Sequence, residues 1–383
     1  MTAPHPDVAD LAPKVAARAE EIEAARRLPA DLAAELAAAG LFRLVVPKSL
    51  GGLELPPGEV VATIEAMAQA DASVAWCLMI AATTGLTSAY LPREIAAEVF
   101  ADPNVITGGV FAPMGKAVVD GDDYVVSGRW SWGSGTANCA WIVGGSLIFE
   151  DSAMRLLPSG QPDHRMMVMP RADVELIDTW HSAGLKGTGS GDFAVEELRV
   201  PRARSVSLIV DAPVEKGPLY AFPAFGLLAL GIAAVAAGNA RAALDEVKAA
   251  LASKRAPGSK RTAAERGAVQ VEVAKSEARL RAARAFLYGA IAEAWEIAQA
   301  TGSIDLDTRA ELRLAATHMT RTAAEVTREA YDLGGGAALF LSNPLQRRFR
   351  DAHAMTQHMM VSPATYELTG RVLLGLPTDA STL

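Results

Sequence analysis

Two histidines near the end of the chain are the side chains best suited to exchange protons. His353 and His358 lie in the segment RDAHAMTQH, residues 350–358, beside Arg350 and Asp351, which we expect to form an ion pair. Imidazole is the side chain that titrates near neutral pH. A spacing of five residues differs from the three or four that would place two metal ligands on one helical face. The pattern favours acid–base chemistry, with an ordinary buried or solvated histidine as the alternative.

A second unusual segment is WSWGSGT, residues 130–136. It combines two indoles with hydroxyl side chains and glycines, a composition suited to lining a planar heteroaromatic ligand with hydrogen-bonding groups nearby. The alternative is a tryptophan-rich strand end that closes a β core. Short motifs of this kind discriminate weakly between the two interpretations.

A third segment, WHSAGLKGTGSGD, residues 180–192, is rich in glycine. Its glycines would let backbone N–H groups approach an anion, Thr188 and Ser190 add hydroxyls, and Lys186 adds positive charge. These are the requirements of a phosphate cradle. A plain glycine-rich loop between two strands explains the pattern equally well.

Signatures of several common enzyme classes do not occur in the sequence. It contains no GxxxxGK[ST], no GxSxG and no HExxH, so nucleotide-binding P-loops, α/β-hydrolases and zinc proteases lose support. Cys77 and Cys139 stand alone, without a second cysteine or a spaced histidine beside them. We expect both thiols to be reduced and structural, and we expect no metal site.

The net charge restricts the possible partners, and the first residues of the chain indicate the expected compartment. The formal net charge of −8 provides no basic surface for nucleic acid. The first residues lack a basic start followed by an apolar stretch, so we expect a cytoplasmic protein. The apolar run 225–237 is broken by glycines and is shorter than the ~20 residues that a membrane span needs. A buried helix explains this run better, and no membrane association is expected.

Three compositional zones must position these segments. Residues 1–101 have the apolar spacing of amphipathic helices, beginning with Val8, Leu11, Val15, Ala19 and Ile22. Residues 102–212 form short β-branched runs separated by Gly, Asp and Pro, which predicts a small antiparallel sheet or barrel with a hairpin turn at Asp120-Gly121. Residues 213–383 return to long helical patterns over 225–251, 262–300 and 307–333, followed by a shorter C-terminal helix. The order predicts an α+β fold: an N-terminal helical domain, a middle β domain and a C-terminal four-helix bundle.

The order of these zones, together with several motifs, resembles the acyl-CoA dehydrogenase superfamily. Within it, the resemblance is to the two-component flavin-dependent monooxygenases, the group that includes 4-hydroxyphenylacetate hydroxylase and dibenzothiophene monooxygenase. It covers nearly the whole chain and rests on LFRLVVPKSLGG, DASVAWCL, VVDGDDYVVSGRWSWGSG, WHSAGLKGTGSGDFAVEELRVP and LQRRFRDAHAMTQH. The glycine-rich segment and the RDAHA…H segment are the most specific of these.

The catalytic base separates the branches of this superfamily. Acyl-CoA dehydrogenases commonly carry a glutamate a few residues after the RDA stretch, where it removes the α-proton of a thioester. Here that region reads HMMV from His358, and Glu367 follows too late to align without a gap. The resemblance therefore implies a monooxygenase, in which a histidine ends the equivalent segment and a serine-glycine pair, here Ser134 and Gly135, ends the strand motif.

The resemblance also implies roles for individual residues. Ser134 would lie near the flavin ring and the bound oxygen, and His358, with His353 as a second candidate, would deprotonate or orient the substrate. Lys260 or Arg261 would contact the flavin phosphate of a neighbouring subunit. The remaining flavin contacts would come from Trp132, Trp180, Gly187, Thr188, Gly189 and Ser190. The expected substrate pocket comprises Trp76, Met79 and Met359, although core packing is the simpler explanation for such residues.

The implied cofactors are reduced flavin, as FMNH2 or FADH2, and O2, which react to give a C4a-hydroperoxyflavin. A separate NAD(P)H:flavin reductase would supply the reduced flavin, and the protein would be a homotetramer. The expected substrate is a small phenolic, indole-like or heteroatom-containing molecule. Two alternatives remain: an acyl-CoA dehydrogenase or nitroalkane-oxidase-like enzyme on the same fold, and a helical ligand-binding scaffold without catalytic activity.

Overall fold

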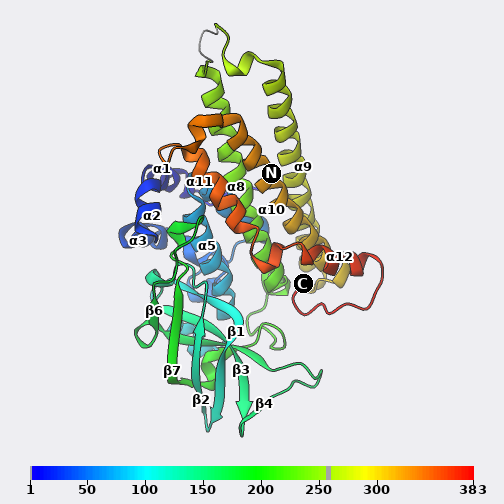
Figure 1. Cartoon of the computed structure of the whole chain (residues 1–383). Helices are drawn as coiled ribbons and strands as arrows, with labels where there is room; N and C mark the ends of the chain where they lie inside the picture. Colours follow the sequence, from blue (N-terminus) through cyan, green and yellow to red (C-terminus); the bar gives the residue numbers. More distant parts are fainter. Residues whose placement is uncertain (1, 256–259) are drawn as a thin grey trace.

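The N-terminal part of the protein is a group of helices that packs beside a long helical bundle (Figure 1). The structure, a computed structural model, describes residues 2–255 and 260–383. Five apolar residues at helical spacing, Val8, Leu11, Val15, Ala19 and Ile22, are all buried, as their periodicity predicts. The helices of this part are α1 (Val8–Ala17), α2 (Ala19–Ala25), α3 (Ala30–Ala38), α4 (Pro57–Ala70), α5 (Ala72–Gly85) and α6 (Arg93–Val99).

The middle part is one eight-stranded sheet in the order β6-β7-β2-β1-β3-β5-β8, with β4 paired to β3. Strands β1 and β3 run parallel, so the prediction of an antiparallel sheet is wrong for this pair. Between them the chain runs back along β2, antiparallel to β1, and reverses again after β2, so β3 has the same direction as β1. The strands are β1 (Thr107–Asp120), β2 (Asp123–Trp130), β3 (Trp141–Glu150), β4 (Ala153–Met154), β5 (His164–Pro170), β6 (Glu175–Ile177), β7 (Asp192–Pro201) and β8 (Ser205–Val206).

The hairpin turn between β1 and β2 lies where the sequence predicts it. Asp120 pairs with Asp123 at the end of the antiparallel ladder. Gly121 adopts φ of 59°, a backbone conformation that glycine reaches without steric cost.

Trp130 closes the core of the sheet. Its ring is fully buried, stacks on Phe193 at 5.1 Å and donates its indole N–H to the Gly145 carbonyl at 2.6 Å. A Cβ atom at Gly115, Gly128 or Gly144 would lie within 3 Å of this ring. The sheet therefore accommodates one large indole by leaving out three side chains around it.

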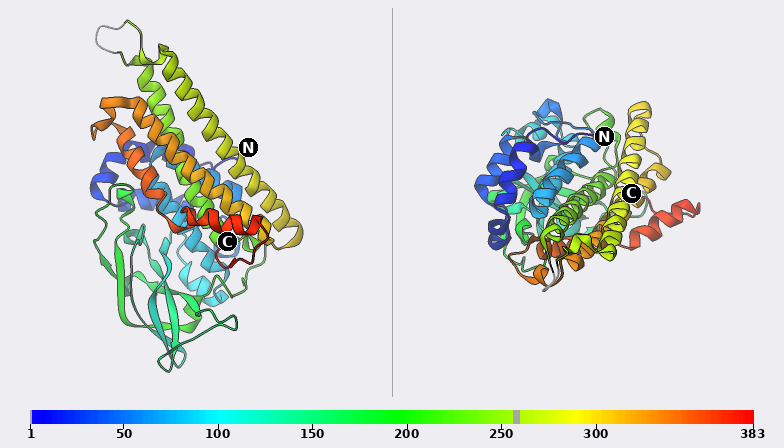
Figure 2. Two further views of the ribbon diagram at one scale, coloured as in Figure 1. Left: turned by 45° about the vertical axis from the view of Figure 1, so that its right-hand side comes forward. Right: turned by 90° about the horizontal axis from the view of Figure 1, so that it is seen from above.

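The C-terminal part is built on three long helices, α8 (Ala224–Ser253), α9 (Gly267–Thr301) and α10 (Leu306–Gly334). The prediction of one shorter helix after them is incomplete, because α11 (Pro344–Met355) and α12 (Ala364–Leu373) both follow, separated by a turn at residues 356–363. A four-residue helix, α7 (Pro218–Ala221), precedes the bundle. Figure 2 shows α8 passing between the N-terminal helices and the other bundle helices, in agreement with its packing against both α4 and α10.

Two helical stretches are long and apolar enough to cross a membrane by length and composition: 72–89 and 224–253. Both are mostly buried inside the protein, the second by 89% of its most apolar window. Burial by neighbouring helices accounts for their apolar character without a membrane. The division at residues 101 and 212 stays a prediction, although α6 ends at Val99 and β1 begins at Thr107.

Candidate active site

Two loops at the same end of the sheet carry the hydroxyl side chains of the candidate site. The β2–β3 loop contains residues 131–136, and the β6–β7 loop contains residues 178–191. They pair through their backbones: Gly133 N–H donates to the Gly191 carbonyl, and Gly135 N–H donates to the Thr188 carbonyl, both at 2.9 Å. The structure thus brings together the two segments that the sequence singled out separately.

Three buried hydroxyls form a continuous hydrogen-bonded chain between these loops. The Oγ atoms of Ser134 and Ser190 lie 2.6 Å apart, and Ser190 Oγ lies 2.6 Å from Thr188 Oγ1. The Thr188 hydroxyl donates to the Leu185 carbonyl at 2.8 Å. At the other end, the indole N–H of Trp76, on α5, donates to Ser134 Oγ at 3.1 Å. We call this series, from Trp76 to the Leu185 carbonyl, the hydroxyl chain.

Leu185 anchors one end of the hydroxyl chain. It adopts φ of 51°, a conformation that costs a non-glycine residue free energy and persists only when the surroundings fix it. Its N–H donates to Asp351 Oδ1 at 2.6 Å, and its carbonyl also accepts the indole N–H of Trp180 at 2.9 Å. A residue of α11 in the helical bundle therefore holds a loop of the β domain.

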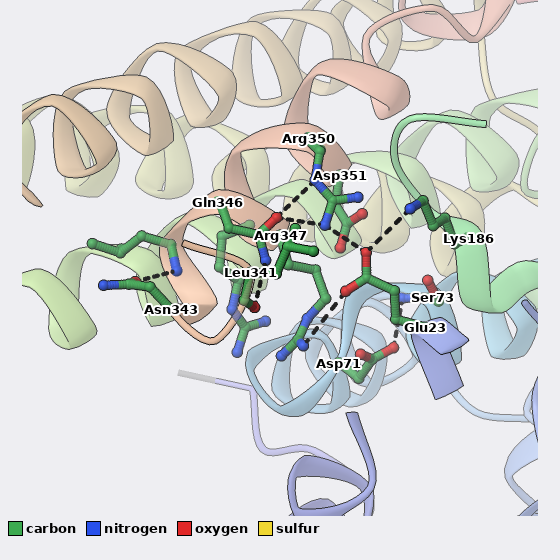
Figure 3. A network of polar contacts seen from close by, with 12 residues as sticks. Glu23, Asp71, Ser73, Lys186, Leu341, Asn343, Gln346, Arg347, Arg350 and Asp351 are labelled. Atoms are coloured by element: carbon green, nitrogen blue, oxygen red, sulfur yellow. Dashed lines mark hydrogen bonds and ion pairs between the residues drawn. The ribbon is translucent and has the colours of Figure 1, made fainter. Parts of the chain in front are cut away.

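An ionic cluster surrounds this anchor (Figure 3). The carboxylate of Glu23 is flanked by Arg350, Arg347 and Lys186, with the Lys186 ammonium at 3.7 Å. The expected ion pair between Arg350 and Asp351 is wrong in this form: Arg350 pairs with Glu23, and Asp351 accepts the backbone of Leu185. Sequence adjacency on a helix directs the two side chains in different directions.

The carboxyl of Asp351 is fully buried, and burial together with nearby Asp71 raises its pKa to about 7. Asp71 is buried as well and caps α5 by accepting the N–H groups of Ser73 and Val74. Burial likewise raises the pKa of Asp71. Two carboxyl groups that share a water-poor interior resist carrying two negative charges, so the anchor is sensitive to pH.

Gly187 and Gly189 were both expected in an anion cradle. The structure gives a different reason for glycine at each of the two positions. A Cβ at Gly187 would lie 2.3 Å from Ile22 Cγ2, so glycine is required there for packing against α2. Gly189 adopts φ of 55°, which favours glycine. The Lys186 ammonium faces Glu23. Direct contact of these residues with flavin stays a prediction.

His358 lies on the turn after α11, close to the Trp76 end of the hydroxyl chain. Its ring meets that of Trp76 edge to face, with centroids 5.9 Å apart. Burial and the positive charge of Arg313 lower the pKa of His358 to about 4, so the ring is neutral at pH 7. Nδ1 accepts the N–H of Met360 at 3.2 Å, which assigns the ring proton to Nε2.

The other candidates near the C-terminus lie in different surroundings. His353 is exposed on α11 and packs against Phe349 at a ring-centroid distance of 4.6 Å. Burial, Arg328 and Arg321 lower its pKa. Met359 is 65% exposed. The structure therefore brings His358, and not His353, to the hydroxyl chain.

The remaining predicted residues divide between the site and other places. Trp132, in the β2–β3 loop, has a side chain that is 62% exposed and a backbone φ of 68°. Trp180 is half-buried above Leu185. Met79 is fully buried and packs on Gly231 of α8. Lys260 and Arg261 belong to the connection between α8 and α9, and the α8–α9 hairpin and the sheet extend toward opposite ends of the molecule (Figure 1).

Sequence reasoning missed the connections between these residues. It named Trp76 as a pocket wall, whereas its indole N–H also enters the hydroxyl chain. It overlooked the contact of Asp351 with Leu185 and the influence of Arg313 on His358. The partners are at least 45 residues apart in sequence, so no local pattern could have found them.

Comparison with known proteins agrees with this arrangement. The family model "Acyl-CoA dehydrogenase, N-terminal domain" matches residues 8–93, and "Acyl-CoA dehydrogenase, C-terminal domain" matches residues 230–363. An indole-3-acetate monooxygenase of Pseudomonas putida is 34% identical over 364 residues, covering 94% of this chain and 90% of the relative. This chain belongs to the acyl-CoA dehydrogenase superfamily, in its branch of flavin-dependent monooxygenases.

Other relatives of this branch support the same assignment. The oxygenase component of an FADH2-dependent resorcinol hydroxylase from Rhizobium sp. is 28% identical and covers 96% of this chain and 93% of its own length. The crystal structure of 3-HSA hydroxylase from Rhodococcus sp. RHA1 superposes with a TM-score of 0.90 at 28% identity, over 98% of this chain and 97% of the other. The α+β fold expected from the sequence is confirmed, and the enzyme class is monooxygenase rather than dehydrogenase.

Proposed function

We propose that this chain is the oxygenase component of a two-component system that hydroxylates a small phenolic or indole-like substrate. A separate NAD(P)H:flavin reductase would supply the reduced flavin. The names of relatives support this: they include indole-3-acetate monooxygenase and the oxygenase component of a resorcinol hydroxylase. Both names describe oxygen insertion into an aromatic substrate.

One observation carries the proposal. In the turn after α11 the chain places a neutral, half-buried histidine, His358, beside Trp76 and the hydroxyl chain. Proton abstraction from the α-carbon of a thioester calls for a carboxylate base, and the turn 356–363 contains none. A neutral imidazole and a row of hydroxyls instead suit the orientation of polar groups on a flavin and an aromatic substrate.

We expect the flavin ring to bind at these two loops. The exposed indole of Trp132 and the half-buried indole of Trp180 offer flat apolar faces, and the same two loops carry the buried hydroxyls of Ser134, Thr188 and Ser190. Bound reduced flavin would activate O2 and supply the oxygen atom that enters the substrate. The water-poor surroundings of the hydroxyl chain would limit the wasteful release of hydrogen peroxide.

His358 would orient the substrate by donating a hydrogen bond. With Nδ1 occupied by the N–H of Met360, the neutral ring presents Nε2–H to its surroundings. A role as base would require the opposite tautomer and the loss of that backbone hydrogen bond. Of the two roles expected from the sequence, deprotonation and orientation, the geometry favours orientation toward a substrate oxygen.

Isotope labelling tests the proposal. The purified protein, a flavin reductase, NADH and FMN or FAD are incubated with indole-3-acetate or resorcinol under 18O2, and the products are analysed by mass spectrometry. We expect one 18O atom in the hydroxylated product. Reduction of tightly bound flavin by the substrate alone, under anaerobic conditions and without a reductase, would instead identify a dehydrogenase or oxidase.

The protein would act as a cytoplasmic homotetramer. Several large apolar side chains are exposed on the C-terminal part, and association with further copies of the chain would cover them. The positions of Lys260 and Arg261, far from the two loops of the same chain, agree with contact to the flavin phosphate of a neighbouring subunit. The exposed apolar residues are Leu339, Phe340, Leu341, Leu373 and Leu374.

A further inference from the structure

A small cavity lies behind the β2–β3 loop, where this loop packs against α5 and the start of β1. Its volume is about 10 Å³, which is room for one water-sized molecule. Three parts of the chain that are far apart in sequence meet around it. They contribute Cys77 and Ala81 from α5, Thr107 from β1, and Ser134, Asn138 and Cys139 from the loop.

The cavity lies between the surface and the hydroxyl chain. Among its lining residues, all of them described by the structure, Asn138 and Gly135 are half-buried and the others are buried. The side-chain amide of Asn138 donates to the Leu28 carbonyl at 2.9 Å and so joins the loop to the N-terminal helices on this side. On the inner side the wall includes Ser134, the hydroxyl next to Trp76 in the hydroxyl chain.

The wall of the cavity is mainly apolar, and several of its polar groups already have partners. The Ser134 hydroxyl lies 2.6 Å from Ser190 Oγ, and the Cys139 thiol donates to the Gly135 carbonyl at 3.5 Å. Thr107 contributes one further hydroxyl. A buried water is held by about two to four polar partners. The cavity therefore suits a small apolar molecule better than it suits water.

The two thiols in the wall are in their unreactive form. Burial raises the pKa of the Cys77 thiol far above its usual range, and burial raises the pKa of Cys139 to about 12. The thiolate, and not the thiol, is the form that oxidants attack readily. Both sulfurs can therefore line a site for an oxidising molecule, and their polarisability adds dispersion contacts to it.

We propose that this cavity is an interior binding site for molecular oxygen and that it supplies O2 to the reaction. The inference rests on the proposed function, in which O2 is the co-substrate. O2 is uncharged, apolar and close to water in size. It therefore gains contacts in a cavity whose wall offers water few hydrogen bonds.

Ala81→Val fills the cavity. It adds two carbon atoms at a lining position of α5, where Ala81 is 2% exposed. Ala82→Val is the matched control, because it makes the same change at the next position of the helix, where Ala82 is fully buried and does not line the cavity. Cys77→Ala enlarges the cavity without crowding the core, so it keeps the test available if Ala81→Val does not fold.

Xenon locates the site directly, because this apolar atom occupies dry cavities and scatters X-rays strongly. Crystals of the full-length protein and of each variant are pressurised with xenon, and anomalous difference maps are calculated. We expect a xenon peak between α5 and the β2–β3 loop in the wild type and in Ala82→Val, a stronger peak in Cys77→Ala and a loss of the peak in Ala81→Val. An ordered water with two or more hydrogen bonds at this place, or no xenon in the wild type, overturns the inference.

A second measurement tests whether the reaction draws on this site. Photoreduced flavin bound to the protein is mixed with O2 in a stopped-flow instrument, and the rate constant for its oxidation is determined. We expect oxidation to be slower in Ala81→Val than in the wild type and unchanged in Ala82→Val. Equal rates in Ala81→Val and the wild type overturn the role of the cavity in supplying O2. If the protein binds no reduced flavin, the proposed function fails, whereas the xenon maps still decide whether the cavity binds an apolar gas.

Discussion

The two ends of the hydroxyl chain are held in different ways. At the donor end, Trp76 makes one hydrogen bond, 3.1 Å long, to Ser134. At the acceptor end, the Leu185 carbonyl receives three hydrogen bonds, from the Thr188 hydroxyl, the Thr188 N–H and the Trp180 indole, while its N–H donates to Asp351 at 2.6 Å. The donor end belongs to the N-terminal helices, and the acceptor end depends on the bundle.

This difference indicates which part of the molecule determines the site. The donor end contributes contact and orientation next to His358, whereas the acceptor end fixes the path of the β6–β7 loop. We therefore expect changes beside Trp76 to affect chemistry, and changes beside Leu185 to affect stability and flavin binding first.

Replacing His358 should affect the donor end most. His358→Ala removes the Nε2–H group that would orient the substrate, and loss of one positioned hydrogen-bond donor lowers turnover by about a hundredfold or more. We expect product formation per O2 consumed to fall by about that factor, with the fold intact by circular dichroism. The comparison variant is His353→Ala, on the exposed face of α11, whose effect should be far smaller. Equal losses in both variants would contradict the geometry.

Replacing Asp351 should affect the acceptor end most. Asp351→Ala leaves the buried N–H of Leu185 without its acceptor, which should lower the free energy of unfolding by roughly 2 kcal/mol. Urea denaturation measures this loss. Asp351→Asn keeps a side-chain oxygen to accept the bond and should recover much of it. If Asp351→Ala unfolded at the same urea concentration as the wild type, the contact between Asp351 and Leu185 would not hold the loop.

Asp351 also gives the acceptor end a dependence on pH. Its pKa is raised in the folded protein to about 7, from about 4 in an unfolded chain, so the folded state binds the proton more tightly. The protonated carboxyl therefore stabilises the folded state at pH values below the pKa of the unfolded chain, and this contribution is lost as the pH rises toward 7. We expect the difference in unfolding free energy between wild type and Asp351→Asn to change over this window and to level off above it. A difference that is constant with pH would argue against titration of Asp351.

Trp76→Phe should cause the mildest change. The aromatic packing against His358 is kept and one hydrogen bond is lost, which predicts a destabilisation of about 1 kcal/mol. Thermal unfolding at fixed pH is a sufficient measurement. A loss as large as that of Asp351→Ala would mean that the two ends are equally important and would remove the distinction between them.

The fold could be predicted from sequence to the extent that its patterns are local. Helical periodicity at Val8 to Ile22 and the Asp-Gly turn at 120–121 depend on neighbouring residues, and both are confirmed. The parallel pairing of β1 with β3 depends on how the chain returns after β2, which no local pattern encodes. The family resemblance, by contrast, drew on motifs spread over the chain and is confirmed by the relatives.

The candidate site could be predicted as a set of residues but not as a network. The glycine-rich and tryptophan-rich segments were recognisable because their composition is unusual, and the structure places them together. The pairing of Arg350 with Glu23, and of Asp351 with Leu185, depends on tertiary packing between three parts of the chain. The contact of Asp351 holds Leu185, at whose carbonyl the hydroxyl chain ends.

The most direct test of the account is a single turnover without any reductase. Photoreduced FMN or FAD is bound to the protein under anaerobic conditions and mixed with O2 and an indole-like or phenolic substrate, and product and hydrogen peroxide are measured. The account predicts hydroxylated product approaching one per reduced flavin, with little peroxide. Peroxide formed as fast as with free reduced flavin, and no product, would contradict it.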